Sequence, residues 1–166
     1  MKNIAVIGYG VIGKRVADAI NLQEDLNLAG VCDVISDWRL QNAVRKEYDI
    51  YAATAEAEDE MNASGISVKG NLQDLLEKVD LVVDCTPKAI SALNVPHYKK
   101  KGVKFIVQGG DKHETTGHSF SAENNYESAL NLDATRVVSC NTTSILRTLT
   151  ALKRADLLDY ARGTLL

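Results

Sequence analysis

The stretch Ile4-Ala5-Val6-Ile7-Gly8-Tyr9-Gly10-Val11-Ile12-Gly13 decides the fold, because it joins a short apolar run directly to a Gly-x-Gly-x-x-Gly turn. A continuous apolar run of this length is typical of a strand that is buried on both faces of a parallel sheet. Apolar side chains then recur at helical spacing between residues 12 and 20. The stretch therefore predicts a dinucleotide-binding turn between a strand and a helix. Its three glycines would permit the tight turn (Gly8), the approach of a pyrophosphate (Gly10) and the packing of helix on strand (Gly13).

A second run, Leu26–Asp33, predicts the next strand and ends in an acid about 20 residues beyond Gly13, the spacing at which the fingerprint carries a carboxylate. Such a carboxylate accepts a hydrogen bond from the adenosine ribose 2′-hydroxyl and repels a 2′-phosphate. We therefore expect NAD as the cofactor, with NADP as the alternative. The simpler interpretation is that Asp33 only caps a turn.

The remaining pattern predicts an α/β fold with a doubly wound parallel sheet, the Rossmann arrangement of dinucleotide-binding domains, over residues 1–155. Strands alternate with helices, and such crossovers are right-handed. Six strands in the order 3-2-1-4-5-6 are expected. Besides the first at 4–7, they cover residues 26–33, 48–52, 79–84, 103–107 and 133–139.

Two further turns are candidates to line the cofactor cleft, because open α/β sheets bind ligands outside the carboxyl ends of their strands. Thr86 and Pro87 follow the strand at 79–84. Gly109 and Gly110 follow the strand at 103–107, where they permit a close approach of the backbone.

Cys140 lies in the stretch Val137–Ser144, where a β-branched apolar run stops and a helical pattern begins. A cysteine on the opening turn of a helix sits where backbone N–H groups and the helix dipole favour an anion. The thiolate is the nucleophilic form of cysteine, so Cys140 is the candidate nucleophile. The alternative is a buried structural thiol. Cys32 and Cys85 lie at apolar strand ends and are expected in the core, although Cys85 could touch the cofactor cleft.

The composition argues against several classes of protein, among them nucleic-acid-binding and membrane proteins. The chain has 166 residues, 45% hydrophobic residues and a formal net charge of −3, with no basic cluster typical of nucleic-acid binding. No apolar run reaches the roughly 20 residues that span a membrane. Three widely spaced cysteines indicate reduced thiols and a cytoplasmic location. No ligand cluster for a metal is visible. The three histidines, at 97, 113 and 118, are expected to be solvated.

Four blocks in order along the chain resemble the archaeal-type (type II) glyceraldehyde-3-phosphate dehydrogenases. They are Gly8–Ala19, Asp74–Asp80, Val107–Gly110 and Val137–Thr143. The resemblance implies a phosphorylating oxidoreductase of glycolysis and gluconeogenesis that is usually a homotetramer. It takes a small aldehyde and inorganic phosphate as partners, with no nucleic acid and no membrane.

The same resemblance assigns roles to individual residues. Cys140 would attack glyceraldehyde 3-phosphate to give a thiohemiacetal, lose a hydride to the cofactor, and leave a thioester that phosphate releases as 1,3-bisphosphoglycerate. Ser139, Asn141 and Thr142 match positions that hold the substrate. Positions that contact the cofactor are matched by Val11, Ile12 and a glycine of the turn after the fifth strand.

Family members also carry a second, catalytic domain with the catalytic histidine and the phosphate-binding basic residues. We therefore expect residues 156–166 to begin a truncated catalytic domain, starting with a strand from Leu158, and this chain alone to bind cofactor without completing catalysis. Two alternatives stay open. One is a related acyl-phosphate reductase such as a semialdehyde dehydrogenase, and the other is a non-catalytic NAD-binding module.

Overall fold

The computed structural model describes residues 1–108 and 110–164 and is built on one seven-stranded parallel sheet, in the order β3-β2-β1-β4-β5-β7-β6. The strands are β1 (Lys2–Ile7), β2 (Leu26–Asp33), β3 (Ile50–Ala52), β4 (Leu81–Asp84), β5 (Lys104–Val107), β6 (Ser119–Phe120) and β7 (Ala134–Val137). Because every pairing is parallel, the carboxyl ends of the strands meet at one edge.

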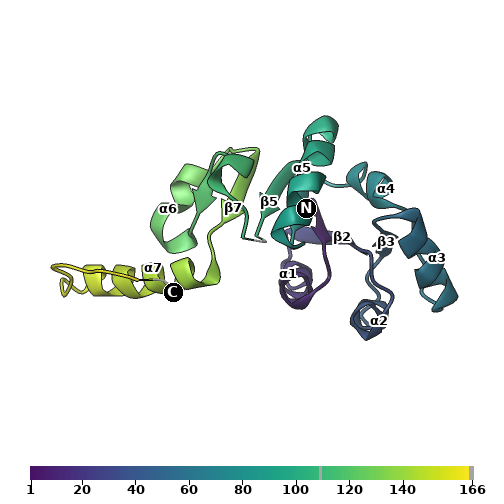
Figure 1. The fold of residues 1–166 in the computed structure, drawn as a ribbon, viewed down its shortest axis with the longest axis horizontal. Helices are drawn as coiled ribbons and strands as arrows, with labels where there is room; N and C mark the ends of the chain where they lie inside the picture. The colour runs from purple at the N-terminus through teal and green to yellow at the C-terminus, as the bar shows by residue number, and fades with distance from the viewer. Residues whose placement is uncertain (109, 165–166) are drawn as a thin grey trace.

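Helices cover both faces of the sheet, as Figure 1 shows. In this view α1 and α2 lie below the sheet, whereas α4 and α5 lie above it. The helices are α1 (Val11–Asn21), α2 (Trp38–Arg45), α3 (Ala55–Ala63), α4 (Leu72–Leu76), α5 (Lys88–Lys101), α6 (Ala122–Ala129) and α7 (Cys140–Arg154), with a short 3-10 turn at His113–Thr115. The layers are those of a doubly wound Rossmann-like NAD(P)-binding domain.

The core has two halves because successive side chains of a strand point to opposite faces. Ile4 and Val6 of β1 belong to the half that packs against α1 and α2. Ala5 and Ile7 belong to the half that packs against α4 and α5. All four side chains are at most 3% exposed, which explains why β1 reads as a continuous apolar run rather than an alternating one.

The turn between β1 and α1 depends on close backbone approach. Gly8 has a φ of 85°, and a Cβ there would lie 2.9 Å from the backbone nitrogen of Thr86 in the turn after β4. A Cβ on Gly13 would overlap the carbonyl oxygen of Gly8. Gly10 faces open space, because a Cβ there would meet no described atom within 4 Å beyond its chain neighbours. The three glycines therefore differ: two are needed for packing, and one leaves room for a ligand.

The predicted fold class and strand order are confirmed, with one addition. The strand predicted at 133–139 is β7, and the sheet continues beyond it to β6, which the sequence did not indicate. β6 has two residues in a polar segment, so no alternating pattern marks it. It is held through pairing with β7, where the Val138 N–H donates to the Phe120 carbonyl at 3.2 Å.

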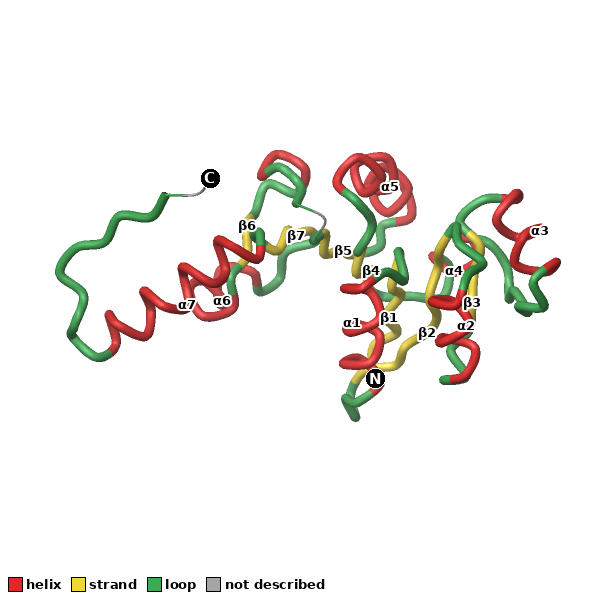
Figure 2. The backbone as a smooth tube through the Cα atoms, turned by 60° about the horizontal axis from the view of Figure 1, so that its bottom comes forward, coloured by secondary structure: helices red, strands yellow, loops and turns green. Residues whose placement is uncertain are grey.

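The strand predicted from Leu158 is wrong for the part that the structure describes. Residues 157–164 carry no regular secondary structure. A strand needs a hydrogen-bonding neighbour, and no β-pairing involves these residues. Figures 1 and 2 both place α7 and this segment at the end of the molecule opposite α2 and α3. Leu165 and Leu166 lie outside the described residues.

Substitution of two glycines should separate packing from ligand approach. We expect Gly13→Ala to lower the free energy of unfolding by about 1–3 kcal/mol, the range for overpacked sites, because the methyl group overlaps the Gly8 carbonyl. Gly10→Ala should leave the free energy of unfolding within about 0.5 kcal/mol of the native value, as substitutions at surface positions usually do. Urea unfolding followed by circular dichroism measures both. Equal losses for the two variants would contradict this interpretation of the turn.

Candidate functional site

A cleft of about 760 Å³ opens at the carboxyl edge of the sheet, between the β1–α1 turn and the ends of β2, β4 and β5. Parallel α/β sheets bind their ligands at this edge. Of the predicted cofactor residues, six line the cleft: Gly8, Gly10, Ile12, Asp33, Thr86 and Pro87. The structure therefore brings together residues that lie far apart in the sequence, from Gly8 to Pro87.

The N-terminus of α1 faces this cleft without a side-chain cap. Gly10 is the N-cap residue, and no acidic side chain occupies the first turn. The first N–H groups of a helix have no partner within the helix, so they can bind an anion. Val11 and Ile12 are 63% and 47% exposed, so this turn is accessible. A pyrophosphate fits here on both charge and space.

Asp33 closes a turn, which is the simpler of the two interpretations that the sequence left open. One carboxylate oxygen accepts the Tyr9 N–H at 2.5 Å, and the other accepts the N–H groups of Val34 at 2.7 Å and Ile35 at 3.3 Å. Asp33 therefore does close a turn. It also lines the cleft, and a carboxylate has about four acceptor positions, so room remains for a ribose hydroxyl.

The turn after β4 is held by a buried carboxylate that the sequence patterns did not single out. Asp84 is fully buried and accepts four hydrogen bonds. Thr86 donates through its N–H at 2.9 Å and its hydroxyl at 2.5 Å, Tyr98 through its hydroxyl at 2.7 Å, and Asn94 through its amide at 3.1 Å. The only signal in the sequence was an acid at the end of a buried strand. The network fixes Thr86 at the wall of the cleft.

Cys32 is buried in the core, as predicted, whereas Cys85 is only half-buried against it, and both line the cleft. Burial raises the pKa of the Cys85 thiol to about 12, although the Gln108 amide that donates to its sulfur at 2.9 Å acts in the opposite direction. Burial also raises the pKa of the Cys32 thiol, with the charge of Asp33 as a further cause. In both residues, desolvation disfavours the thiolate, which is the nucleophilic form of cysteine.

Cys140 lies in a second hollow of about 700 Å³, which has Ile12 and Gln108 in common with the first cleft. The sulfur is exposed at the first residue of α7. Ser139 caps the helix by accepting the Thr142 N–H at 3.2 Å. The two hollows are therefore neighbours.

Of the four residues that the sequence predicted at the start of this helix, two line the hollow and two do not. Ser139 and Cys140 line the hollow, whereas Asn141 and Thr142 are not among the lining side chains. Asn141 holds its amide oxygen 3.9 Å from the Cys140 sulfur, and the Thr142 hydroxyl lies 2.9 Å from that of Ser139. The sequence missed four members, which follow on one side of α7: Thr143, Ser144, Arg147 and Thr148.

Gly110, in the turn after β5, belongs to the second hollow rather than the first. Gly110, with a φ of 83°, lines it together with Cys140. Gly109 lies outside the described residues, so its predicted cofactor contact stays a prediction.

The histidines do not lie in either hollow. His118 is not simply solvated as expected: its two ring nitrogens lie 2.7 Å from the Thr135 hydroxyl and 2.9 Å from the Ser128 hydroxyl, which ties its loop to β7 and α6. His113 contacts the Ser119 hydroxyl at 2.9 Å, and His97 contacts Gln73 at 3.3 Å.

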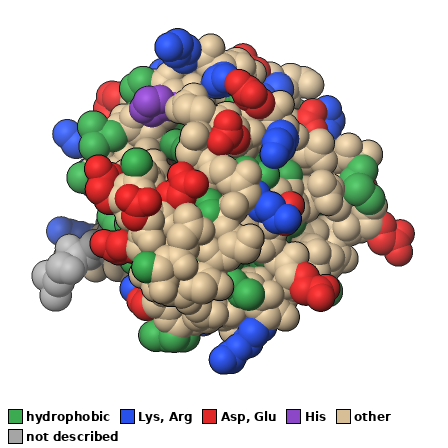
Figure 3. All heavy atoms as spheres, turned by 90° about the vertical axis from the view of Figure 1, so that its right-hand side faces the viewer, with side chains coloured by type: hydrophobic (Ala, Val, Ile, Leu, Met, Phe, Trp, Pro, Cys, Tyr) green, Lys and Arg blue, Asp and Glu red, His purple; other side chains and the backbone are tan. Residues whose placement is uncertain are grey.

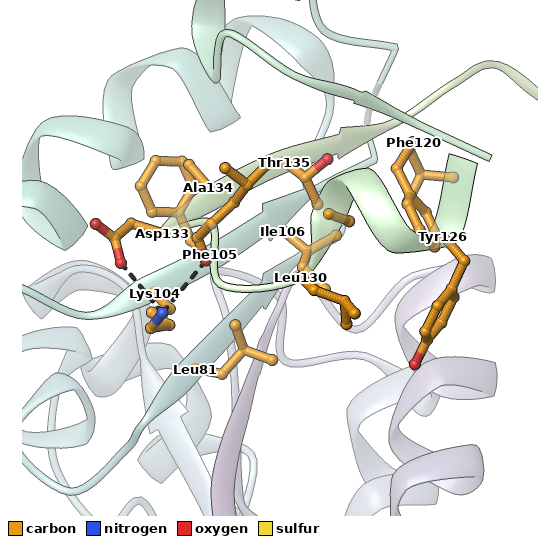
Figure 4. A pocket seen from close by; sticks show the side chains of 13 residues that line it. Leu81, Lys104, Phe105, Ile106, Phe120, Tyr126, Leu130, Asp133, Ala134 and Thr135 are labelled. Carbon is orange, nitrogen blue, oxygen red and sulfur yellow. Dashed lines mark hydrogen bonds and ion pairs between the residues drawn. The ribbon is translucent and has the colours of Figure 1, made fainter. Parts of the chain in front are cut away.

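An apolar groove between α6 and the sheet is a third hollow (Figure 4). Phe120, Tyr126, Leu130 and Ile106 point into it, with the Lys104–Asp133 ion pair of 3.2 Å at one end. It contains no nucleophile, so it is not a candidate reaction site.

Among the described residues no three metal-ligating side chains cluster, and no helix is long and apolar enough to cross a membrane. Figure 3 shows acidic and basic side chains interspersed over one end of the molecule.

Alkylation should distinguish the three thiols. At pH 8 we expect iodoacetamide to modify Cys140 at least ten times faster than Cys32 or Cys85, because Cys140 is exposed whereas burial keeps the other two thiols protonated. Peptide mapping by mass spectrometry at successive times gives the three rates. Cys140→Ser is the control and should have no fast-reacting thiol. Equal rates at Cys85 and Cys140 would contradict the assignment.

Comparison with known proteins identifies relatives of this chain in sequence. Residues 2–142 match the family model described as dihydrodipicolinate reductase, N-terminus. Glyceraldehyde-3-phosphate dehydrogenase of Methanothermus fervidus is 48% identical over 149 residues, which are 90% of this chain and 44% of the relative. Glyceraldehyde-3-phosphate dehydrogenase 2 of Methanosarcina barkeri is 46% identical over 162 residues, which are 98% of this chain and 48% of the relative. The chain thus spans less than half the length of these relatives.

Two solved structures share the fold. Aspartate semialdehyde dehydrogenase II of Vibrio cholerae has a TM-score of 0.63 at 16% identity, over 93% of this chain and 47% of that one. An NAD-binding protein from Listeria innocua has a TM-score of 0.57 at 15% identity, over 93% of this chain and 40% of that one. Identities this low show the fold alone. The chain belongs to the family described as the N-terminus of dihydrodipicolinate reductase, and it is homologous to the N-terminal NAD-binding region of archaeal glyceraldehyde-3-phosphate dehydrogenases.

Proposed function

We propose that this chain is the cofactor-binding region, with the nucleophile, of an NAD-dependent phosphorylating glyceraldehyde-3-phosphate dehydrogenase. One observation carries the proposal: the cleft beside the β1–α1 turn and the hollow at Cys140 share Ile12 and Gln108. A hydride acceptor in the first would lie next to a thiohemiacetal in the second. The identity of 46–48% over about 90% of the chain supports the substrate assignment.

The residues present fit a dinucleotide. The uncapped N-terminus of α1 would bind the pyrophosphate, Gly10 leaves the space for it, and Asp33 would accept a ribose hydroxyl. Val11 and Ile12 would contact the cofactor from the first turn of α1, with Thr86 and Pro87 opposite. The predicted contacts of Gly109 and Gly110 complete the proposed set. The bound nicotinamide supplies a two-electron acceptor for hydride.

Cys140 would supply the covalent step. Its thiolate attacks the aldehyde carbon, a carbon–sulfur bond forms, and the carbonyl π electrons move to oxygen to give the thiohemiacetal. Loss of hydride from that carbon leaves a thioester. An oxygen of inorganic phosphate then attacks, the carbon–sulfur bond breaks, and the thiolate returns as 1,3-bisphosphoglycerate leaves. N–H groups at the start of α7 would stabilise each oxyanion, while Ser139, Asn141 and Thr142 would position the substrate.

No histidine of the described residues lines the Cys140 hollow, so the proposal takes the general base from outside this region. The relatives are about twice as long as the matched region, which leaves room for such a part. The homo-oligomer that the resemblance implies would likewise involve that further part. Its support here is the exposure of apolar side chains at the same end as α6 and α7, such as Tyr126 at 57% and Tyr160 at 83%.

Two other functions are weaker. A semialdehyde dehydrogenase would use the same cysteine chemistry, and the Vibrio cholerae enzyme shares the fold, but at 16% identity. A non-catalytic NAD-binding module would not need an exposed thiol beside the cofactor cleft, as Cys140 is here.

Cofactor binding should depend on the carboxylate of Asp33. We expect the native chain to bind NAD and Asp33→Asn to raise the Kd about ten-fold, the effect of losing one charge-assisted hydrogen bond. Isothermal titration calorimetry measures both, and urea unfolding checks that the turn survives. Asp25→Asn, at an exposed acid just before β2, is the matched control and should leave the Kd unchanged. An unchanged Kd for Asp33→Asn would contradict the assigned role.

Substrate choice should separate the two enzymatic functions. In a full-length protein that contains this region, we expect kcat/KM for glyceraldehyde 3-phosphate to exceed that for aspartate semialdehyde at least a hundred-fold. Cys140→Ser should abolish both activities. The 166-residue chain by itself should show at most a single turnover. The reverse preference would favour the semialdehyde dehydrogenase, and sustained turnover by the short chain would refute the need for a second part.

A further inference from the structure

The hollow at Cys140 contains a cation that the proposed mechanism does not use. Arg147 follows Cys140 by seven residues on α7 and lines the same hollow. We propose that Arg147 binds the phosphate group of an aldehyde phosphate whose carbonyl carbon lies at the Cys140 sulfur, and so selects anionic over neutral aldehydes. The inference rests on the proposed covalent chemistry of Cys140. It adds a phosphate contact within this chain, whereas the resemblance implies phosphate-binding basic residues only in a second domain.

The charge of the hollow favours an anion. Arg147 is the one basic side chain among the described residues that line it, and no acidic side chain is among them. None of the ion pairs between described residues includes Arg147, whose side chain is exposed. By contrast, Arg154 at the end of the same helix pairs with Glu123 at 3.2 Å. A guanidinium offers a phosphate two parallel hydrogen bonds, so a phosphate is the anion that fits Arg147 best.

The position of Arg147 on α7 matches the length of a three-carbon phosphate ester. Seven residues are nearly two helical turns, so Cys140 and Arg147 share one side of α7, about 10.5 Å apart along its axis. A helical side chain leans toward the N-terminus and covers the turn before its own Cα. The guanidinium therefore lies about one turn, or roughly 5 Å, closer to Cys140 than its Cα does. About one turn then separates the guanidinium from the sulfur, which a three-carbon backbone bridges.

The direction of α7 gives such a substrate one orientation. In Figures 1 and 2, α7 runs away from α1 and from the cofactor cleft at its N-terminus. The carbonyl carbon at Cys140 then faces the cofactor, and the phosphate at Arg147 points away from it. Inorganic phosphate must instead reach the carbon that is bonded to sulfur. The separation of the two residues therefore favours the ester phosphate over inorganic phosphate at Arg147.

The hydroxyl groups along this side of α7 leave the guanidinium as the main donor. The Thr143 hydroxyl donates to the Val138 carbonyl at 3.4 Å, and the Thr148 hydroxyl donates to the Ser144 carbonyl at 3.1 Å. These bonds use the threonine hydrogens, so the two oxygens are left as acceptors. A phosphate needs donors, which the Arg147 guanidinium and the Ser144 hydroxyl supply here.

The test measures protection of Cys140 and needs neither cofactor nor turnover. Iodoacetamide is neutral, and its reaction with Cys140 in the 166-residue chain is followed by peptide mapping. The protecting ligands are glyceraldehyde 3-phosphate, glyceraldehyde and inorganic phosphate, each titrated to half-protection. The variants are Arg147→Gln and Arg147→Lys. Lys153→Gln removes a cation from the last turn of α7 and is the matched control.

We expect glyceraldehyde 3-phosphate to protect the native chain at a concentration about ten-fold lower than glyceraldehyde does, the effect of one charge-assisted hydrogen bond. Arg147→Gln should raise the half-protecting concentration of the ester about ten-fold and that of glyceraldehyde less than two-fold. Arg147→Lys should keep part of the advantage, because it retains the charge but not the bidentate geometry. The alkylation rate without ligand should change less than two-fold in every variant, and Lys153→Gln should behave as the native chain.

Three results would overturn the inference while leaving the proposed function intact. The first is equal protection of the native chain and Arg147→Gln by the ester. The second is inorganic phosphate that protects as well as the ester and loses as much in Arg147→Gln, because the site would then bind free phosphate. The third is a slower alkylation without ligand that accounts for the whole change, because Arg147 would then act on the thiol. Failure of both aldehydes to protect native Cys140 would instead overturn its proposed covalent role.

Discussion

The close contact between two turns at the carboxyl edge of the sheet is the constraint on which the site depends. The turn after β1 passes so near the turn after β4 that a Cβ on Gly8 would lie 2.9 Å from the Thr86 nitrogen. Gly13 in turn lets α1 start directly against the Gly8 carbonyl. A side chain at either glycine would require the start of α1 or the turn after β4 to shift.

Buried Asp84 makes the second turn rigid enough for that contact. A buried carboxylate is costly unless its acceptor positions are filled, and here four donors fill them. Two of these donors, Asn94 and Tyr98, belong to α5, so the network joins the helix to the cleft wall. An apolar core alone would not specify where Thr86 stands. This polar network does so, while the apolar side chains around it supply the stability.

The three cysteines show how position, and not residue type, decides reactivity. Cys32 and Cys85 end buried strands, and desolvation disfavours their thiolates. Cys140 follows a strand of the same sheet, but it begins a helix at the surface, where backbone N–H groups are unpaired. The fold therefore exposes one sulfur in the hollow beside the cleft and keeps the two others buried or half-buried.

The sequence by itself determined the features that depend on local chain order. The apolar runs, the spacing of the three glycines, Asp33 at the end of β2 and Cys140 at the start of α7 all follow from neighbours in the sequence, and the fold class and strand order followed from their alternation. Other features arise between residues far apart in the chain, which no local pattern records. These are the pairing of β6 with β7, the meeting of two hollows at Ile12 and Gln108, and the donors to Asp84. Only the tertiary structure decided them, because hydrogen bonds and burial are set by distance in space.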